Sequence, residues 1–417
     1  MISFFSYSTY FCPFNYLSYY DFLNCSSMKL IGEEDLSALS SVLAKYTNLS
    51  NLELNLENQI GTSSIGLSSL GSALVNCTDL SNLTLNFRKN KIGQETASDL
   101  ASALAKCTNL SYLTLFLSGN QIGAKGMPNL VSGLVKCTNL LNLTLEIGGN
   151  KIGQEGALIL ASAVSKFTSI QTMTLDVTCN YIYAKGASSL CFALTQCRNL
   201  QNLILNFSRN KIGDKGMLEL GSSIANFINL SSFTLNLRDN KIYNEGTLEL
   251  GFALAKCINL QNLTLYLYNN KIGYKGASGL GFALSNCTYL QKLTIDLHWN
   301  KMGTKDTSCL DLALENFTQL TYLNLNLNCN SINDESACSL ISGIVKCINL
   351  SNLELHLCYI QLSAKSVSFL GSALAKCTNL SNLLLYLSMS HQQSSSPNLM
   401  KKILKLKRLV VKSIYLY

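Results

Sequence analysis

Histidine, proline and tryptophan are scarce in this chain of 417 residues, which contains three, three and one of them respectively. His298, His356 and His391 are the only histidines, and no serine or cysteine lies in a recognised nucleophile motif. Single histidines on a protein surface are more often incidental than catalytic when no partner group accompanies them. We therefore expect no catalytic residues and do not interpret the chain as an enzyme.

Motifs for cofactors and metals are also missing. The sequence has no G-x-x-x-x-G-K-[ST] phosphate loop, no G-x-G-x-x-G after a strand, and no kinase catalytic loop or D-F-G triplet. No closely spaced Cys or His pairs have the spacing of a zinc site. These absences argue against a nucleotide-binding domain, a kinase domain and a structural zinc site, so we predict neither cofactor nor metal.

Charge is low, since charged residues make up 13% of the chain and the net charge is only +8. Six positive charges lie near the C-terminus, at Lys401, Lys402, Lys405, Lys407, Arg408 and Lys412. A nucleic-acid groove needs basic residues concentrated along one face, and the rest of the chain does not show this. We expect no nucleic-acid partner. The basic tail could instead bind acidic lipid or serve as a nuclear import signal.

A thirty-residue repeat dominates what is present. It is defined by residues 77–106, CTDLSNLTLNFRKNKIGQETASDLASALAK, and stepping by thirty from Cys77 reaches Cys377 without insertion or deletion. An earlier copy headed by Tyr46 is one residue longer. A period of this length is typical of solenoids, in which each unit buries its apolar face against the next.

Each repeat is predicted to contain a strand, a turn and a helix. Leu83, Leu85 and Phe87 alternate with polar residues, which is strand periodicity. After Ile92 and Gly93 the apolar spacing changes to three and four, which predicts an amphipathic helix. The period places Pro128 and Pro397 in the first helical turn, where proline is tolerated.

The run L-x-L-x-[LF]-x-x-N-x-I-G followed by G-A-x-x-L-x-x-A-L resembles the leucine-rich repeat family, in the ribonuclease-inhibitor-like subfamily. The resemblance covers residues 28–389. It implies an α/β fold, a right-handed solenoid or horseshoe with a parallel sheet on the concave face and helices on the convex face. The segment from Leu80 to Asn90 is about two residues longer than the family's L-x-x-L-x-L-x-x-N form, which we interpret as a longer strand or a bulged entry.

One asparagine recurs at the end of each predicted strand, from Asn90 in steps of thirty to Asn330. Its amide can donate to and accept from backbone groups that the turn leaves unpaired. Ile360 and Ser390 break the series. We expect the array to degrade after Asn330 and to end in a capping segment.

Cysteine is abundant, with sixteen residues in the chain. Eight of them share one repeat position with Phe167, Phe227 and Phe317, which indicates a small apolar core site and argues against a disulfide framework. Free core thiols favour a reducing compartment, so we predict a cytoplasmic protein. The N-x-[ST] matches arise because the repeat spells N-L-T, and glycans there would obstruct the sheet face.

The chain is divided into four predicted regions. Residues 1–27 are an aromatic N-terminal extension, 28–46 a capping half-repeat, 47–389 the repeat array and 390–417 a basic C-terminal cap. The extension lacks the basic start and cleavage site of a secretory signal, and polar residues interrupt it too often for a membrane span. We interpret it as a cover for the first repeat or a poorly ordered extension, with a cleaved signal as the alternative. Val410, Val411, Ile414 and Leu416 are predicted to form a final edge strand.

Two repeat positions on the outer face of the predicted sheet vary while the rest of the unit stays nearly constant. Large aromatic residues are enriched among the residues that dominate binding energies. We therefore predict that a protein partner contacts Glu146, Asp176, Tyr266, Tyr268, Asp296, His298, Trp299, His356 and Tyr386. Drift among exposed positions is the alternative, because scattered exposed aromatics are normal.

Our functional hypothesis is a monomeric, non-enzymatic scaffold that binds a protein partner on the concave face of its solenoid. One alternative is a regulator of a small GTPase, because GTPase-activating leucine-rich repeat proteins belong to the subfamily that this chain resembles. Another is a secreted recognition module.

Overall fold

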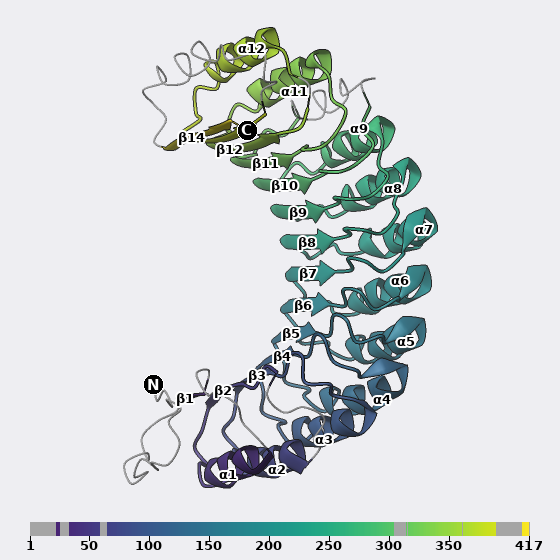
Figure 1. The fold of residues 1–417 in the computed structure, drawn as a ribbon, viewed down its shortest axis with the longest axis vertical. Coiled ribbons are helices and arrows are strands. Elements are labelled where there is room, and N and C mark those ends of the chain that lie inside the picture. The colour runs from purple at the N-terminus through teal and green to yellow at the C-terminus, as the bar shows by residue number, and fades with distance from the viewer. Residues whose placement is uncertain are drawn as a thin grey trace. The chain divides into compact units, whose positions relative to one another are not determined.

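The computed structural model of the protein describes residues 22–25, 33–58, 65–303, 314, 316–360, 362–388 and 411–416. The chain divides into two compact units, with residues 1–210 in unit 1 and residues 211–417 in unit 2. In each unit the strands form one layer and the helices form the other (Figure 1). The alternation of strand and helix that the repeat predicts is therefore present in both units.

Unit 1 contains thirteen described elements. They are β1 (Phe22–Cys25), α1 (Glu33–Leu43), β2 (Asn51–Asn55), α2 (Ile65–Leu74), β3 (Asn82–Asn86), α3 (Gln94–Leu104), β4 (Tyr112–Phe116), α4 (Gly123–Leu134), β5 (Asn142–Glu146), α5 (Gly153–Val164), β6 (Thr172–Asp176), α6 (Tyr183–Leu194) and β7 (Asn202–Asn206).

Unit 2 repeats the pattern. Its described elements are α7 (Gly213–Ile224), β8 (Ser232–Asn236), α8 (Asn244–Leu254), β9 (Asn262–Tyr266), α9 (Tyr274–Leu284), β10 (Lys292–Asp296), β11 (Tyr322–Asn326), α11 (Asp334–Lys346), β12 (Asn352–Leu357), α12 (Ala364–Leu374), β13 (Asn382–Leu387) and β14 (Val411–Leu416).

The strands of each unit are parallel and follow the order of the chain, β1 to β7 in unit 1 and β8 to β14 in unit 2. Pairing partners are thirty residues apart in most strands, as for Leu83 with Leu113 and Leu293 with Leu323. Each inward leucine therefore stacks on its equivalent in the next repeat, and together they form a continuous core.

The additional residues in each repeat extend the strand pairing. Phe87 N donates to Phe116 O over 2.8 Å and Lys89 N donates to Ser118 O over 3.0 Å, although β3 and β4 end earlier. Phe87 is fully buried, as are the leucines before it. The longer-strand interpretation thus applies here, and the residue-by-residue register of β3 and β4 contains no bulge.

The buried asparagines link successive turns of the backbone. Asn120 Oδ1 accepts from the backbone N–H groups of Asn90 and Ile92, both over 2.9 Å. Asn120 Nδ2 donates to Phe87 O over 2.9 Å and to Leu117 O over 2.8 Å. One side chain satisfies four buried backbone groups, so this position is fixed by hydrogen bonding as predicted.

Two sequence expectations were wrong. Pro128 lies in the second turn of α4, because that helix begins at Gly123 and a turn takes about 3.6 residues. The array also does not degrade after Asn330, because β12 and β13 keep the parallel register. Ile360 is buried in place of an asparagine. There the side chain of Asn328 accepts from the backbone N–H of Cys358 over 2.6 Å.

The C-terminal strand was predicted correctly, since β14 pairs in parallel with β13. The structure also places a strand, β1, within the predicted N-terminal extension, where it pairs with β2. Pro397 and the part of the predicted C-terminal cap before Val411 lie outside the described residues. No helix in the described part of the chain has both the length and the apolar character that a membrane span requires.

The cysteine column lies in the core. Cys107, Cys137, Cys257 and the other described members are at most 6% exposed, as is Phe227 at the same position. Burial raises the pKa of the Cys107 thiol to about 12 and that of Cys137 to about 11. These thiols behave as small apolar core groups, as the sequence predicts.

Candidate functional site

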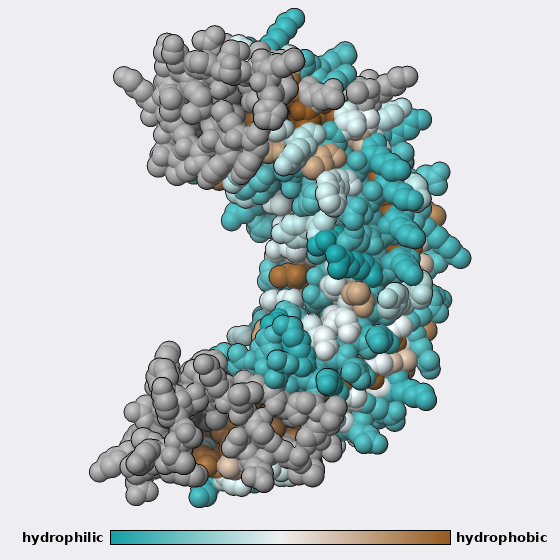
Figure 2. Space-filling model, viewed as in Figure 1, coloured by the Kyte–Doolittle hydropathy of each residue, from teal (hydrophilic) through white to brown (hydrophobic). Residues whose placement is uncertain are grey.

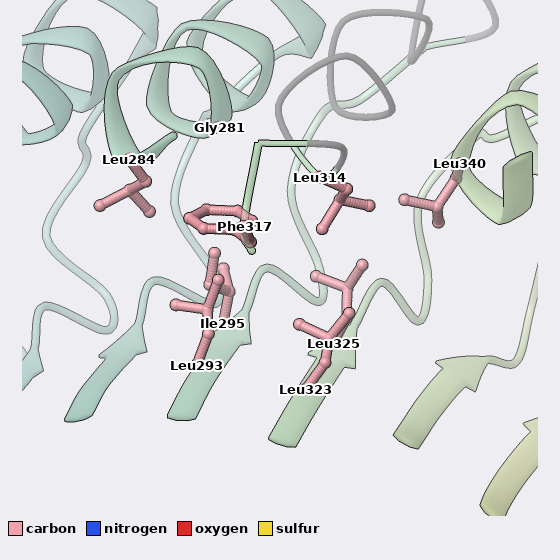
Figure 3. Close-up of a pocket in the computed structure, with 9 residues that line it drawn as sticks. All are labelled: Gly281, Leu284, Leu293, Ile295, Leu314, Phe317, Leu323, Leu325 and Leu340. Carbon is pink, nitrogen blue, oxygen red and sulfur yellow. The ribbon is translucent and has the colours of Figure 1, made fainter. Parts of the chain in front are cut away.

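A small cavity lies inside unit 2, between the helix layer and the sheet (Figure 3). It is lined by Gly281, Leu284, Leu293, Ile295, Leu314, Phe317, Leu323, Leu325 and Leu340, and its volume is about 20 Å³. A space of that size holds at most one water, and an apolar wall offers water no hydrogen bonds. We interpret this cavity as a packing defect and not as a ligand site.

The outward face of the sheet in unit 2 carries a row of side chains across β9 to β13. Tyr266, Asp296, Asn326, His356 and Tyr386 are register partners on successive strands. Four of these residues belong to the predicted contact patch, and Asn326 fills the middle position. The fixed strand register therefore brings these predicted residues into one line.

A second row contains three stacked groups. The guanidinium of Arg238 lies over the Tyr268 ring, with Cζ 4.2 Å from the ring centroid. Tyr268 stacks on His298 with centroids 4.2 Å apart and planes 14° apart. Because neighbouring parallel strands are about 4.8 Å apart, side chains at one repeat position can stack face to face. Trp299 lies next to His298 with a centroid distance of 6.4 Å.

Each histidine of the patch is fixed by an acidic residue on its own chain segment. His298 Nδ1 lies 2.6 Å from Asp296 Oδ1, and His356 Nε2 lies 2.9 Å from Glu354 Oε1. His356 also stacks on Tyr386, with centroids 4.1 Å apart. These contacts fix the orientation of both rings before any ligand binds.

An open groove of about 460 Å³ lies at the stacked row. Its lining residues are Arg238, Tyr268, Asn269, His298, Trp299, Asn328, Cys329 and Tyr359. Trp299 is 59% exposed and Tyr359 is 73% exposed. Figure 2 shows that hydrophobic side chains are scattered over the described surface on the viewed face, where hydrophilic ones predominate.

Five groove residues were missing from the predicted patch, namely Arg238, Asn269, Asn328, Cys329 and Tyr359. Tyr359 could have been found, because it occupies the same repeat position as Trp299 two units later. Arg238 could have been found as well, because it shares the repeat position of Tyr268 and His298.

Glu146 and Asp176 belong to unit 1, where they are register partners on β5 and β6. Arg88 forms an ion pair with Glu146, and its Cζ lies 4.2 Å from the centroid of the Phe116 ring. Asp176 Oδ2 accepts from Asn206 Nδ2 over 2.9 Å. The side chains of these two predicted contact residues are thus already paired with other side chains of unit 1.

The described side chains of the site form a surface for contacts, and no nucleophile is paired with a base among them. The described contacts of the His298 ring are with Tyr268, Trp299, Asp296 and Asn326, none of which is a serine or cysteine that it could activate. Across the described residues there is no group of three or more His, Cys, Asp or Glu that could hold a metal ion. The expectation that the protein uses neither metal nor cofactor stays a prediction.

Comparison with known proteins supports the assignment of the repeat. A family profile described as Leucine Rich repeat matches residues 197–221. The fold is a leucine-rich repeat solenoid. The leucine-rich repeats account for the parallel strands, the buried leucine columns and the asparagine ladder in both units. Among curated proteins, none matches this sequence.

Several solved structures are similar to this chain. An internalin (inlF) from Listeria monocytogenes str. 4b F2365 has a TM-score of 0.48 and 20% identity, covering 86% of this chain and 88% of that one. An internalin C2 (inlC2) from the same strain has a TM-score of 0.31 and 20% identity, covering 70% and 84%. The TLR13–ssRNA13 complex has a TM-score of 0.37 and 18% identity, covering 89% of this chain and 57% of that one.

Proposed function

We propose that this leucine-rich repeat protein is a non-enzymatic scaffold that binds a protein partner on the outward face of the sheet in unit 2. The observation that carries the proposal is the open groove in which Trp299 and Tyr359 stand exposed beside the stacked Tyr268 and His298. Trp, Tyr and Arg are the residue types that most often dominate protein interfaces.

The groove is preorganised for binding. Arg238 is fixed from two sides, by the Tyr268 ring and by Asp239, whose Oδ2 lies 2.8 Å from Nε. His298 is fixed by Tyr268 and Asp296. Ordering side chains on binding costs about 0.5 to 1.5 kcal/mol for each group that is immobilised. Groups that are already stacked and paired avoid much of that cost.

We infer the remaining properties from the same features. A nucleic-acid partner is disfavoured because the one arginine in the groove is balanced by a carboxylate. The described cysteines form no disulfide, which favours a reducing location, so we propose the cytoplasm. Helices of ten to thirteen residues between the strands support the ribonuclease-inhibitor-like subfamily. We propose that the protein acts as a monomer.

Affinity capture tests the proposal. The wild-type protein and a Tyr266→Ala/Trp299→Ala double variant are compared, with Tyr112→Ala as the control because Tyr112 is a 50% exposed strand residue of unit 1. We expect the wild type and the control to retain the same partner and the double variant to lose it, with affinity confirmed by calorimetry. Equal recovery by all three proteins would show that the groove is not the binding site.

A GTPase assay checks the alternative class of function. The purified protein is added to a panel of GTP-loaded small GTPases, and phosphate release is followed over time. We expect rates equal to those without the protein. A rate increase with any GTPase would contradict the proposal of a scaffold without catalytic effect.

A further inference from the structure

Trp299, Cys329 and Tyr359 occupy one repeat position in three consecutive units, and all three have left-handed backbone angles, with φ of 52°, 55° and 56°. Trp299 N donates to Asn328 O over 3.1 Å, and Cys329 N donates to Cys358 O over 3.0 Å. The same backbone geometry and the strand pairing therefore project the three side chains in the same direction from adjacent turns.

The middle residue is small, so the two aromatic rings flank a slot. Two strand spacings place the Cα atoms of Trp299 and Tyr359 about 9.6 Å apart. The Trp299 ring is tilted by 54° from the His298 ring, which stacks on Tyr268, so the slot is not bounded by two parallel aromatic faces. The slot therefore suits a puckered saturated ring better than a flat aromatic one.

Hydrogen-bond donors outnumber acceptors at this slot. Trp299 Nε1, the Nη atoms of Arg238 and Nδ2 of Asn328 donate to no described residue. Asp239 accepts from Arg238 and from Asn269, and Asp296 is paired with His298. The nearby carboxylates are therefore in use, and Asn269 Oδ1 is the one groove amide oxygen that has no described donor.

We propose that the slot between Trp299 and Tyr359 holds a proline-rich segment of the protein partner in the polyproline II conformation. Such a segment has free carbonyl acceptors and no internal hydrogen bonds, and each proline lacks an N–H donor. It therefore matches a groove with excess donors, and its pyrrolidine rings fit between aromatic walls. This inference rests on the proposed function and specifies the chemistry of the partner.

Other occupants fit less well. A lysine or arginine side chain stacks on aromatic faces but gains most when an unpaired carboxylate is near, and the carboxylates here are already paired. An acidic peptide would bring acceptors for the Nη atoms of Arg238, but the carboxylates of Asp239 and Asp296 beside the groove would repel its negative charges. Both are outcomes of the test below.

Trp299 is the only tryptophan in the chain, so its fluorescence reports directly on the slot. The full-length protein is titrated with decaproline, with a decapeptide of alternating Gly and Ser, and with decapeptides rich in Lys or Asp. We expect a saturable shift of Trp299 emission to shorter wavelength with decaproline only. A stronger response to the Lys-rich or Asp-rich peptide, or no response to decaproline, would overturn the inference.

Filling the slot provides the matched test. Cys329→Phe places a ring between Trp299 and Tyr359, and Cys179→Phe makes the same change at the equivalent position of unit 1, where φ is also 55°. We expect decaproline affinity to fall at least tenfold in Cys329→Phe and in Tyr359→Ala, and to be unchanged in Cys179→Phe. Circular dichroism checks that each variant is folded. If the folded variants bind decaproline as tightly as the wild type does, the slot is not the binding site.

The outcomes separate this inference from the proposed function. If Trp299→Ala abolishes capture of the partner while decaproline has no effect on the wild type, the scaffold proposal stands and the proline chemistry is wrong. If neither capture nor decaproline depends on Trp299, both are wrong. If decaproline competes with the captured partner, both are supported.

Discussion

Units 1 and 2 are built from the same repeat but differ on the outward face of their sheets. In unit 1 the variable positions contain Arg88, Glu146 and Asp176, which are satisfied by contacts within the unit, together with Gly148 and Gly149. In unit 2 the same positions contain a stacked arginine, tyrosine and histidine, followed by an exposed tryptophan and tyrosine.

This difference separates the residues that build the fold from those that are available for binding. The buried leucines, asparagines and cysteines recur in both units because every turn must bury the same core and satisfy the same backbone groups. The outward positions have no such constraint. A surface can therefore be specialised in one unit while the outward charged side chains of the other are paired within that unit.

The largest expected effect is on the shared core. Asn120→Ala removes four hydrogen bonds to buried backbone groups, and leaving such groups unsatisfied costs about 1 to 3 kcal/mol each. We expect unfolding in urea to show a loss of at least about 4 kcal/mol. Asn139→Ala is the control, because Asn139 donates one hydrogen bond, to Thr108 O, in an exposed position. We expect this variant to lose less than about 1 kcal/mol of unfolding free energy. Similar losses in the two variants would show that the buried asparagines stabilise the fold no more than an exposed one does.

The second effect sharpens the difference between the units. Trp299→Ala should weaken partner binding by about 2 kcal/mol or more, because central aromatic residues dominate interface energies. Its effect on unfolding should stay within about 0.5 kcal/mol, since the side chain is 59% exposed. Calorimetry and urea unfolding of the same samples measure both. If the partner affinity stays unchanged while the free energy of unfolding falls, Trp299 stabilises the fold and does not bind the partner.

The third effect concerns pH and applies to both units. Burial raises the pKa of Cys257 and Cys347 to about 12 from an ordinary value of 9.0, and that of Cys197 to about 11. Above pH 9 the unfolded chain loses these protons while the folded chain keeps them, so stability is complete below pH 9 and falls as pH rises toward 12. Unfolding followed from pH 8 to 11 should show a loss of roughly 1 kcal/mol per thiol per pH unit.

A substitution isolates that contribution. Cys257→Ala should reduce the slope of unfolding free energy against pH above 9, because the titrating group is removed. Ser222→Ala, at an exposed position of α7, serves as the control and should leave the slope unchanged. A slope that is identical in all three proteins would show that the buried thiols do not govern alkaline stability.

The smallest effect lies in the helix layer of unit 2. Gly221 and Gly251 occupy the same repeat position, but a Cβ at Gly221 would meet nothing closer than 3.5 Å, whereas at Gly251 it would lie 2.9 Å from Ala283 Cβ. Gly221→Ala should therefore stabilise the protein by about 0.5 to 1 kcal/mol through helix propensity. Gly251→Ala should gain less or destabilise. Equal effects in thermal unfolding would contradict the close approach of α8 and α9.

Much of the fold could be predicted from the sequence because core positions repeat with fixed spacing. The spacing of Leu83 and Asn90 was sufficient to predict the strands and the ladder. The end of the array was predicted wrongly, because strand pairing and burial of the leucines keep the parallel register of β12 and β13 even where Ile360 replaces the asparagine. Pro128 was misplaced because the helices begin earlier than the glycine spacing suggested, at Gly123 in α4 and Gln94 in α3, which makes this repeat position the fifth or sixth helical residue.

The candidate site was only partly predictable. Aromatic composition indicated Tyr268, His298 and Trp299, and the structure places these three side chains in contact. The groove itself depends on Arg238 lying over Tyr268 and on Cys329 leaving a gap before Tyr359, which follow from packing between repeats. A list of variable positions does not contain that information.

Site-specific photo-crosslinking tests the central claim most directly. A photoreactive phenylalanine analogue replaces Tyr359 in unit 2 or Tyr112 in unit 1, and each protein is irradiated in an extract that contains the partner. We predict one discrete crosslinked product from position 359 and none from position 112. Crosslinks of equal yield from both positions, or from position 112 alone, would contradict a binding surface confined to the groove of unit 2.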